Sequence, residues 1–296
     1  MKVAVVGTGL MGLPVAVRLA EAGHDVTVHT RRKESAGPAL AAGAAWADSA
    51  AAAGDGADVA ITFLPDPPTV EAAVLGPDGL LAAATPPAVV ADMSTGPPEL
   101  ARRLAAAAEA RGVAALDAPV SGGPPGAAAG TLTIMAGGTS EAFALARPVL
   151  AELGTAVLVG GPGAGQSLKL VNQLLIGGIA GGIADAWALS GALGLDPAIV
   201  AEVVGRGFGA SPLLAFMWPR LAGGDLAPGF KVDHMIKDLT LALAAGDEHG
   251  LDLAAGRSAQ ERYRWLSDAG DGDLGTQALY RHAVRHHSTV EEDDRP

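Results

Sequence analysis

The sequence contains no cysteine, which excludes disulfide bonds, thiolate metal sites and a cysteine nucleophile. Aromatic residues make up only 4% of the 296 residues, while hydrophobic residues reach 49%, so the core must be built from alanine, valine and leucine. Positive charge is also scarce, with 20 Lys and Arg against 32 Asp and Glu and a formal net charge of -12. Such a chain repels phosphate backbones, so we expect a small-molecule ligand and no nucleic-acid partner.

Targeting and membrane signals are also lacking. The N-terminal apolar run has no clear cleavage site, and the longest apolar run, 170–183, is too short to cross a bilayer and contains two amides. We expect no targeting sequence, no membrane segment and a cytoplasmic protein. The length allows two domains, each with a core of its own.

Glycine is abundant, and three glycines follow the first apolar run directly. Residues 3–6 predict a strand, GTGLMG occupies 7–12, a helical pattern continues to Gly23, and 25–29 predict a second strand. With 41 glycines, about one such spacing is expected by chance, so the placement between strand and helix carries the argument. There the backbone can approach a pyrophosphate at a helix N-terminus. We interpret the motif as a dinucleotide site, with a tight turn as the alternative.

The end of the second predicted strand carries cations. An acid at this point would hold the ribose 2′-hydroxyl of NAD, but Thr30, Arg31, Arg32 and Lys33 stand there instead. Guanidinium groups bind phosphate oxygens in pairs, so the cluster predicts a 2′-phosphate and therefore NADP. A solvated charged loop is the alternative.

Alternating strands and helices continue to about residue 160. Further strands are predicted at 59–64, 88–91, 113–116, 131–136 and 156–159, with the clearest crossover helix at 98–110. This alternation predicts a parallel, doubly wound sheet that binds ligands at the carboxyl ends of its strands. One of these ends carries Ser121, Gly122 and Gly123, whose backbone amides and hydroxyl could hold a carboxylate, unless the segment is an ordinary Pro/Gly turn.

The second half of the chain reads as helical. We expect a domain boundary at 160–165, giving an NADP-binding domain at 1–162, a helical domain for substrate binding and dimerisation at 163–285, and a disordered acidic tail at 286–296. The first helix, 163–194, carries Lys169 with Asn172 and Gln173 on the same face. A buried lysine can transfer protons, although a snorkelling lysine is the alternative.

A second informative segment runs from Phe230 to Leu239. Lys237 and Asp238 precede a predicted helix at 239–245, where Asp238 could cap the helix N-terminus or accept from a catalytic cation. His234 and Asp238 have metal-ligand spacing but no third ligand nearby, so we expect no metal. Paired glycines at 177–178 and 181–182 predict close approach of another helix.

Four motifs in this order resemble the β-hydroxyacid dehydrogenase family, including 3-hydroxyisobutyrate dehydrogenase, tartronate semialdehyde reductase and glyoxylate/succinic semialdehyde reductase. They are GTGLMG (7–12), DAPVSGG (117–123), GAGQSLKLVNQ (163–173) and the spacing from Phe230 to Asp238 with its KDL ending. The resemblance covers about residues 1–285. It implies an α/β fold with an N-terminal Rossmann-type doubly wound parallel sheet, an all-α C-terminal domain, and a long helix that joins them.

The resemblance also implies roles for individual residues. Lys169 becomes the catalytic acid/base, and the substrate-binding residues are Ser121, Gly122, Gly123, Asn172, Gln173 and Asp238. The cofactor-binding residues are Gly7, Gly9, Leu10, Met11, Gly12, Thr30, Arg31, Arg32, Leu64, Pro65, Thr95, Phe230 and Lys237. The family motif usually has asparagine at position 173, so we interpret Gln173 as a marker of specificity.

The expected activity is the NADP(H)-dependent interconversion of a small β-hydroxy acid, or hydroxy acid, and its semialdehyde or oxo acid. NADP is the expected cofactor, NAD a possible one, and the substrate bears a carboxylate. Family resemblance predicts a homodimer or homotetramer with the long helix near the interface. An imine reductase on the same scaffold is one alternative, but such relatives usually replace Lys169. A redox-silent NADP-binding module is the other, and it would not need Lys169, Ser121 and Gln173.

Overall fold

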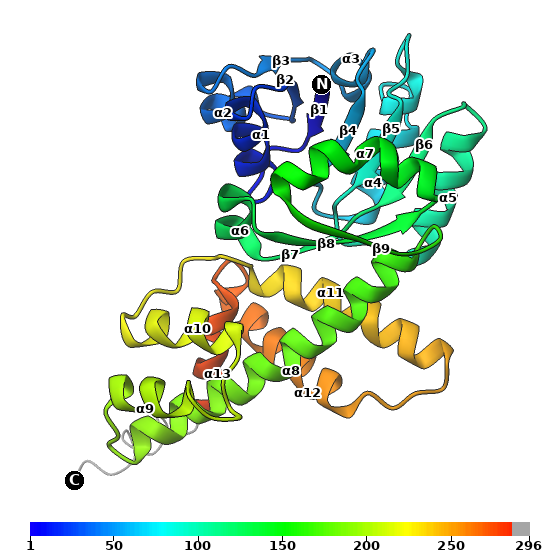
Figure 1. Ribbon diagram of the computed structural model, residues 1–296. Coiled ribbons are helices and arrows are strands. Elements are labelled where there is room, and N and C mark those ends of the chain that lie inside the picture. The colour runs from blue at the N-terminus through cyan, green and yellow to red at the C-terminus, as the bar shows by residue number, and fades with distance from the viewer. Residues whose placement is uncertain (286–296) are drawn as a thin grey trace. The chain divides into compact units, whose positions relative to one another are not determined.

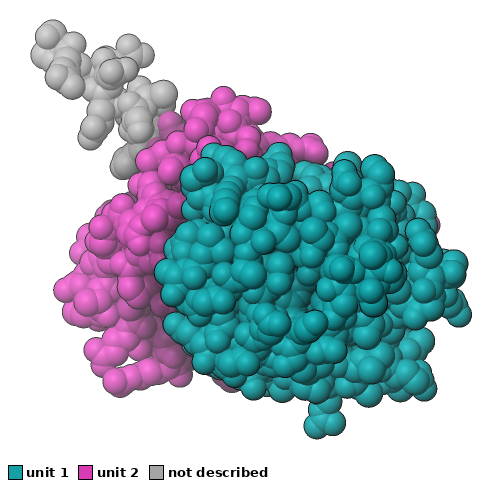
Figure 2. Space-filling model, turned by 90° about the horizontal axis from the view of Figure 1, so that it is seen from above, with its two compact units in different colours: residues 1–169 teal, residues 170–296 magenta. Residues whose placement is uncertain are grey.

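The structure is a computed structural model and describes residues 1–285 (Figure 1). The chain folds into two compact units, unit 1, Met1–Lys169, and unit 2, which begins at Leu170 (Figure 2). The boundary lies inside one helix, α8 (Ala164–Ala192). The domain limits inferred from sequence, 1–162 and 163–285, stay a prediction, and the tail expected at 286–296 lies outside the described residues.

Within the described residues, unit 1 is built on a nine-stranded sheet. The strands are β1 (Lys2–Val6), β2 (Asp25–His29), β3 (Ala45–Trp46), β4 (Val59–Thr62), β5 (Val89–Asp92), β6 (Ala114–Asp117), β7 (Val120–Ser121), β8 (Leu132–Gly138) and β9 (Gly154–Gly160). The first six are parallel and lie in the order β3-β2-β1-β4-β5-β6. This is the doubly wound order, and the predicted fold class is confirmed.

The sheet departs from the all-parallel expectation at one edge. Strand β8 runs antiparallel to β6 and β7 and parallel to β9. Only the seven-residue helix α6 (Gly123–Ala129) and a few loop residues separate β7 from β8. A parallel neighbour needs a crossover of about a dozen residues or more, so this short connection returns the chain antiparallel.

Alternate residues of β1 face two separate cores, which is why the strand reads as a continuous apolar run. Val3 and Val5 pack with buried residues of α1 and α7, whereas Ala4 and Val6 pack with those of α3, α4 and α5. The unit 1 helices are α1 (Gly12–Glu21), α2 (Gly37–Ala41), α3 (Ala50–Gly54), α4 (Pro67–Leu75), α5 (Pro98–Glu109), α6 and α7 (Ser140–Leu153), with 3-10 turns η1 (Lys33–Ala36) and η2 (Leu80–Ala82). The result is a three-layer arrangement with helices on both faces of the sheet (Figure 1).

All the regular elements of unit 2 within the described residues are helices. Its elements are the rest of α8, α9 (Pro197–Val204), α10 (Pro212–Ala222), α11 (Val232–Glu248), α12 (Ala254–Leu266), η3 (Ser267–Asp271), η4 (Thr276–Leu279) and α13 (Tyr280–Val284). Ile183 of α8, Met217 of α10, Leu239 of α11 and Tyr263 of α12 belong to one buried cluster. A Cβ atom at Gly177 would lie 3.0 Å from Leu239, so this glycine allows α8 and α11 to approach closely.

Helix α8 is longer than the apolar run seen in the sequence. By length and composition alone it passes the test for a membrane-spanning helix, with 29 residues. Core helices of water-soluble proteins pass the same test, and Ala180, Ile183 and Ala184 of α8 are buried in the core of unit 2. A single such helix is therefore weak evidence for a membrane span.

Candidate functional site

The turn between β1 and α1 shows why glycine occupies three of its positions. Gly7 has a φ of +97°, and a Cβ atom there would overlap the carbonyl oxygen of Phe63. A Cβ atom at Gly12 would overlap the carbonyl oxygen of Gly7, so helix α1 packs directly on the turn. At Gly9, in contrast, no atom lies within 4 Å of the added position. The open face at Gly9 leaves room for a ligand to approach the backbone, as a pyrophosphate does.

The residues around this turn leave the helix end available. Met11, the residue before α1, makes no side-chain capping hydrogen bond, and Leu10 is 46% exposed. The first amides of a helix attract anions when no side chain satisfies them. The turn therefore has the shape and the polarity of a phosphate-binding loop.

The cations after β2 differ in their surroundings. Lys33 lies over the ring of Trp46, with 5.7 Å from Nζ to the ring centroid. Arg31 and Arg32 are exposed, and within residues 1–285 no hydrogen bond or salt bridge involves either guanidinium group. Thr30 is half-buried beside them. Two unpaired guanidinium groups next to the glycine turn are suited to binding a phosphate.

The loops after β4 and β5 are joined by hydrogen bonds. The amide of Leu64 donates to Ser94 Oγ at 2.9 Å, and the amide of Ser94 donates to Asp92 Oδ1 at 3.0 Å. Thr62 Oγ1 donates to the same carboxylate oxygen at 2.6 Å. Pro65 is exposed and Thr95 is half-buried in these loops. Because β2, β1, β4 and β5 are parallel neighbours, the predicted cofactor residues of unit 1 line one edge of the sheet in order.

The loop after β7 holds the predicted carboxylate-binding residues. Gly122 and Gly123 have φ angles of +131° and +62°, and a Cβ atom at Gly122 would lie 3.1 Å from Leu132. Ser121 is half-buried and pairs with Thr133 in the sheet. Helix α6 begins at Gly123 without a side-chain cap, so backbone amides are available here.

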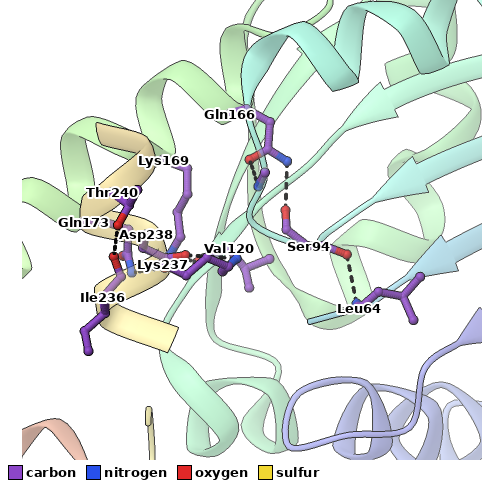
Figure 3. A network of polar contacts seen from close by, with 11 residues as sticks. Leu64, Ser94, Val120, Gln166, Lys169, Gln173, Ile236, Lys237, Asp238 and Thr240 are labelled. Carbon is purple, nitrogen blue, oxygen red and sulfur yellow. Dashed lines mark hydrogen bonds and ion pairs between the residues drawn. The ribbon is translucent and has the colours of Figure 1, made fainter. Parts of the chain in front are cut away.

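Lys169 is buried, with 7% of its surface exposed, and Nζ donates to the carbonyl oxygen of Val120 at 2.7 Å (Figure 3). Val120 directly precedes Ser121, so the ammonium group lies beside the predicted carboxylate loop. The snorkelling alternative is disfavoured, because a snorkelling lysine extends its charged group into water. A buried ammonium group in this position could donate a proton to a substrate if the loop held one.

Two residues that the sequence reading left without a role, Asp117 and Gln166, organise the start of α8. Asp117 accepts from the amide of Gly163 at 2.7 Å and from the amide of Gln166 at 2.8 Å, using a different oxygen for each. Burial raises the pKa of Asp117 to about 6, although these backbone hydrogen bonds oppose the rise, and the nearby charge of Asp92 adds to it. The Gln166 side chain bonds to the backbone of Ser94 and Gly96. The signal in the sequence that could have indicated these contacts is the presence of polar residues at 163–169, at the start of an otherwise apolar helix.

In unit 2 the predicted polar residues form a second set. Gln173 is 2% exposed, and its Nε2 donates to Asp238 Oδ2 at 2.6 Å. Asn172 Nδ2 donates to Gln173 Oε1 at 3.0 Å. Lys237 Nζ lies 3.1 Å from the other oxygen of Asp238, as an ion pair without good hydrogen-bond angles. On α8, Gln173 follows Lys169 by four residues, which places both side chains on one face of the helix.

One interpretation of Asp238 was wrong. Helix α11 begins at Val232, so Asp238 lies inside the helix and cannot cap its N-terminus. The segment 232–238 is helical because Val232, Met235 and Leu239 are buried on one side of it. Asp238 instead faces inward, 1% exposed, and accepts from Gln173.

Phe230 and His234 lie at the N-terminal end of the same segment, and their rings are in contact. Phe230 lies just before α11 and makes an edge contact with the ring of His234, 5.9 Å between centroids. Burial, with a smaller effect from Lys237, lowers the pKa of His234. Within the described residues no group of three or more His, Cys, Asp or Glu could hold a metal ion.

Two family models together cover nearly the whole chain. The NAD binding domain of 6-phosphogluconate dehydrogenase matches residues 2–161. The model described as NAD-binding of NADP-dependent 3-hydroxyisobutyrate dehydrogenase matches residues 163–283.

Individual relatives agree with the family models. A 3-hydroxyisobutyrate dehydrogenase of Pseudomonas aeruginosa is 44% identical over 250 residues, covering 82% of this chain and 84% of the relative. The NAD-dependent L-serine dehydrogenase of the same organism is 41% identical over 277 residues, covering 91% and 93%. The crystal structure of 3-hydroxyisobutyrate dehydrogenase from Salmonella typhimurium has a TM-score of 0.87 at 29% identity, covering 94% of this chain and 98% of that one. An imine reductase from Pseudomonas sp. shares the fold alone, with a TM-score of 0.63 at 23% identity, covering 95% and 98%.

Proposed function

The chain belongs to the β-hydroxyacid dehydrogenase family, and from that premise we propose that it interconverts a small β-hydroxy acid and its semialdehyde or oxo acid with NADP(H). Family membership makes it an NAD(P)-dependent oxidoreductase of the hydroxyacid dehydrogenase type. The observation that carries the finer proposal is the buried Lys169, whose ammonium lies at the backbone of Val120, next to Ser121.

The residues of unit 1 fit a dinucleotide. Gly9 is open where Gly7 and Gly12 are closed, which suits a pyrophosphate at the start of α1. The free guanidinium groups of Arg31 and Arg32 support a 2′-phosphate and therefore NADP over NAD. We assign the adenine end of the cofactor to the loop after β2. The remaining proposed cofactor contacts are Leu10, Met11, Thr30, Leu64, Pro65, Thr95, Phe230 and Lys237.

The proposed chemistry divides between cofactor and protein. When bound, the nicotinamide supplies or accepts a hydride. In the reduction direction the Lys169 ammonium donates a proton to the carbonyl oxygen of the substrate, and in oxidation the neutral amine accepts the hydroxyl proton. The Ser121, Gly122 and Gly123 loop binds the substrate carboxylate and so positions the reacting carbon.

The amides one turn along α8 orient the substrate oxygen in this proposal. Gln173 and Asn172 bond to each other, and Asp238 fixes the orientation of the Gln173 amide by accepting from its Nε2. Lys237 balances the buried carboxylate of Asp238. The glutamine side chain at position 173 is longer than the asparagine usual in the family, so it would limit the length of substrate that fits. For this reason we propose Gln173 as a determinant of substrate specificity.

A substrate and cofactor panel tests this proposal. The loss of NADPH or NADH absorbance is followed with succinic semialdehyde, glyoxylate, tartronate semialdehyde and a cyclic imine, and the gain with 3-hydroxyisobutyrate and L-serine. We expect turnover with at least one carboxylate-bearing substrate, none with the imine, and a preference for NADPH. Turnover with the imine alone would favour the imine reductase, and no turnover with any substrate would favour the redox-silent module.

The variant Lys169→Ala tests the assigned proton donor. Loss of general acid catalysis should lower turnover by about 10²- to 10⁴-fold, while NADPH still binds with its wild-type dissociation constant. The matched control is Leu168→Ala, an exposed neighbour on the same helix. Turnover within tenfold of wild type for Lys169→Ala would refute the assignment.

We further propose the organisation of the chain around this activity. Residues 1–162 form the NADP-binding domain, and residues 163–285 form a helical domain for substrate binding and dimerisation. The exposed apolar side chains of α8, among them Val171, Leu175 and Leu189, support a homodimer or homotetramer. A cytoplasmic location agrees with the absence of cysteine. Size-exclusion chromatography with light scattering tests the oligomeric state.

A further inference from the structure

Gln166 is the most completely buried polar residue of α8 within unit 1, with 1% of its surface exposed. Its Oε1 accepts from the amide of Gly96 at 3.0 Å, and its Nε2 donates to the carbonyl oxygen of Ser94 at 2.8 Å (Figure 3). These two backbone groups flank Thr95. One side-chain amide therefore fixes the backbone on both sides of a proposed cofactor contact.

The helix end that carries Gln166 is itself held in place. The two carboxylate oxygens of Asp117, at the end of β6, accept from the amides of Gly163 and Gln166. A Cβ atom at Gly165 would overlap the carbonyl oxygen of Met135, so α8 begins in direct contact with the sheet. The side chain of Gln166 thus projects from a helix end that is hydrogen-bonded to the end of β6 and packed against β8.

Lys169 follows Gln166 by three residues, and side chains at this spacing lie on neighbouring positions of one helix surface. Its Nζ bonds to Val120, while Gln166 bonds to Ser94 and Gly96. Within unit 1, the first two turns of α8 are therefore tied to the loop after β5 and to strand β7. Moving the Thr95 loop relative to Lys169 requires breaking both hydrogen bonds of the Gln166 amide.

We propose that Gln166 is a positioning residue that holds the Thr95 loop, and with it the reactive end of the cofactor, in a fixed position relative to Lys169. The inference rests on the proposed function, which assigns Thr95 to the cofactor and Lys169 to proton transfer. Gln166 touches neither substrate nor cofactor in this proposal and acts through the two backbone groups it binds. Small displacements between reacting groups are costly, since about 1 Å can reduce turnover by about 100-fold.

A structural role alone would predict something different. A glutamine that only satisfies two buried backbone groups would affect stability when replaced, while turnover per folded molecule stayed the same. A positioning residue lowers kcat and leaves KM nearly unchanged, because the substrate still binds at Ser121. The exchange rate of the Gly96 amide hydrogen reports on the loop without requiring cofactor or substrate.

The experiment compares Gln166→Met with wild type in the full chain. Methionine has a similar length and flexibility but neither donates to Ser94 nor accepts from Gly96 in the same way. We expect the Gly96 amide to exchange at least tenfold faster in the cofactor-free protein, kcat to fall by about 10- to 100-fold, and the substrate KM to change less than threefold. The matched control is Gln260→Met, a buried glutamine of α12 that donates to Thr240 at 2.8 Å. It should change neither the Gly96 exchange rate nor kcat.

A second variant keeps the proposal testable if Gln166→Met does not fold. In Gln166→Glu the carboxylate can still accept from Gly96 but cannot donate to Ser94, so Gly96 should stay protected while kcat falls. Either variant with wild-type kcat, or Gln166→Met with an unchanged Gly96 exchange rate, would overturn the proposal. Retained turnover in Lys169→Ala would refute the proposed proton donor instead, and the Gly96 measurement would still decide whether Gln166 holds the loop.

Discussion

The clearest electrostatic prediction concerns Asp117→Asn. Asp117 is buried at the end of β6, where its carboxylate accepts from the amides of Gly163 and Gln166. Burial disfavours the charged form more than these two hydrogen bonds favour it, so its pKa rises to about 6. Asparagine has nearly the same shape and does not ionise, but only its Oδ1 can accept, so one of the two backbone amides loses its acceptor at every pH. The substitution therefore removes the pH-dependent cost of a buried charge and adds a pH-independent cost for one lost hydrogen bond.

The size of the effect follows from the pKa. A rise from 3.8 to about 6 means that the folded state binds the proton more tightly than the unfolded state. The stabilisation from that proton is complete below about pH 3.8 and is lost as the pH rises through about 6. Between pH 4 and pH 7 the loss amounts to about 2 kcal/mol, out of about 3 kcal/mol in total.

The assay is urea denaturation of wild type and Asp117→Asn between pH 4 and pH 7. Whatever the difference in unfolding free energy at pH 4, we expect the variant to gain about 2 kcal/mol relative to wild type between pH 4 and pH 7. Asp25→Asn, at an exposed carboxylate, is the matched control. If wild type instead gained stability over the variant as the pH rose, the backbone hydrogen bonds would outweigh burial and the reasoning would be refuted.

Two further predictions concern the cofactor. Replacing Arg31 and Arg32 with alanine should weaken NADPH binding by about 10- to 100-fold, because charge-assisted hydrogen bonds to the 2′-phosphate are lost. The dissociation constant of NADH should stay within about threefold of wild type. Lys33→Ala is the control, and an equal loss of affinity for both cofactors would contradict the assignment. Gly9→Ala should keep the wild-type melting temperature, since no protein atom lies within 4 Å of the new methyl group, but it should lose NADPH affinity because the methyl group stands where the pyrophosphate approaches. Gly12→Ala should lower the melting temperature, because its methyl group overlaps the carbonyl oxygen of Gly7. Calorimetry with and without NADPH separates these effects, and a destabilised Gly9→Ala would contradict the second prediction.

Local patterns predicted the parallel core of the fold well, because each element there has a signal within a few residues. The glycine turn follows β1 and opens α1 as expected, and the predicted strand at 59–64 differs from β4 only at its end. Strands β3 and β7 were not predicted. Each has two residues and exists through pairing with a partner, as Val120 pairs with Ile134, so no periodicity marks it in the sequence.

Some features of the candidate site also follow from local sequence patterns, whereas others depend on contacts between distant segments. Residue type and placement pointed to Lys169, Ser121 and the glycines as candidates, and their roles stay predictions. The contacts of Asp117 and Gln166 join positions 46 to 72 residues apart, and no single-sequence pattern reports such a pairing. The misplaced start of α11 has a related cause, since the burial of Val232 and Met235 extends the helix beyond its Leu- and Ala-rich part.

The strand order has a consequence for folding. Strand β1 lies between β2 and β4, so the edge that carries Gly9, Arg31 and Leu64 exists only after segments about 60 residues apart have paired. A nicotinamide dinucleotide therefore finds its site in the folded sheet and not in the unfolded chain. Mass action then makes the ligand a stabiliser of unit 1, by about 2.7 kcal/mol at a hundred times its dissociation constant. The cellular level of the cofactor would thus help to set how long the protein survives as well as how fast it turns over.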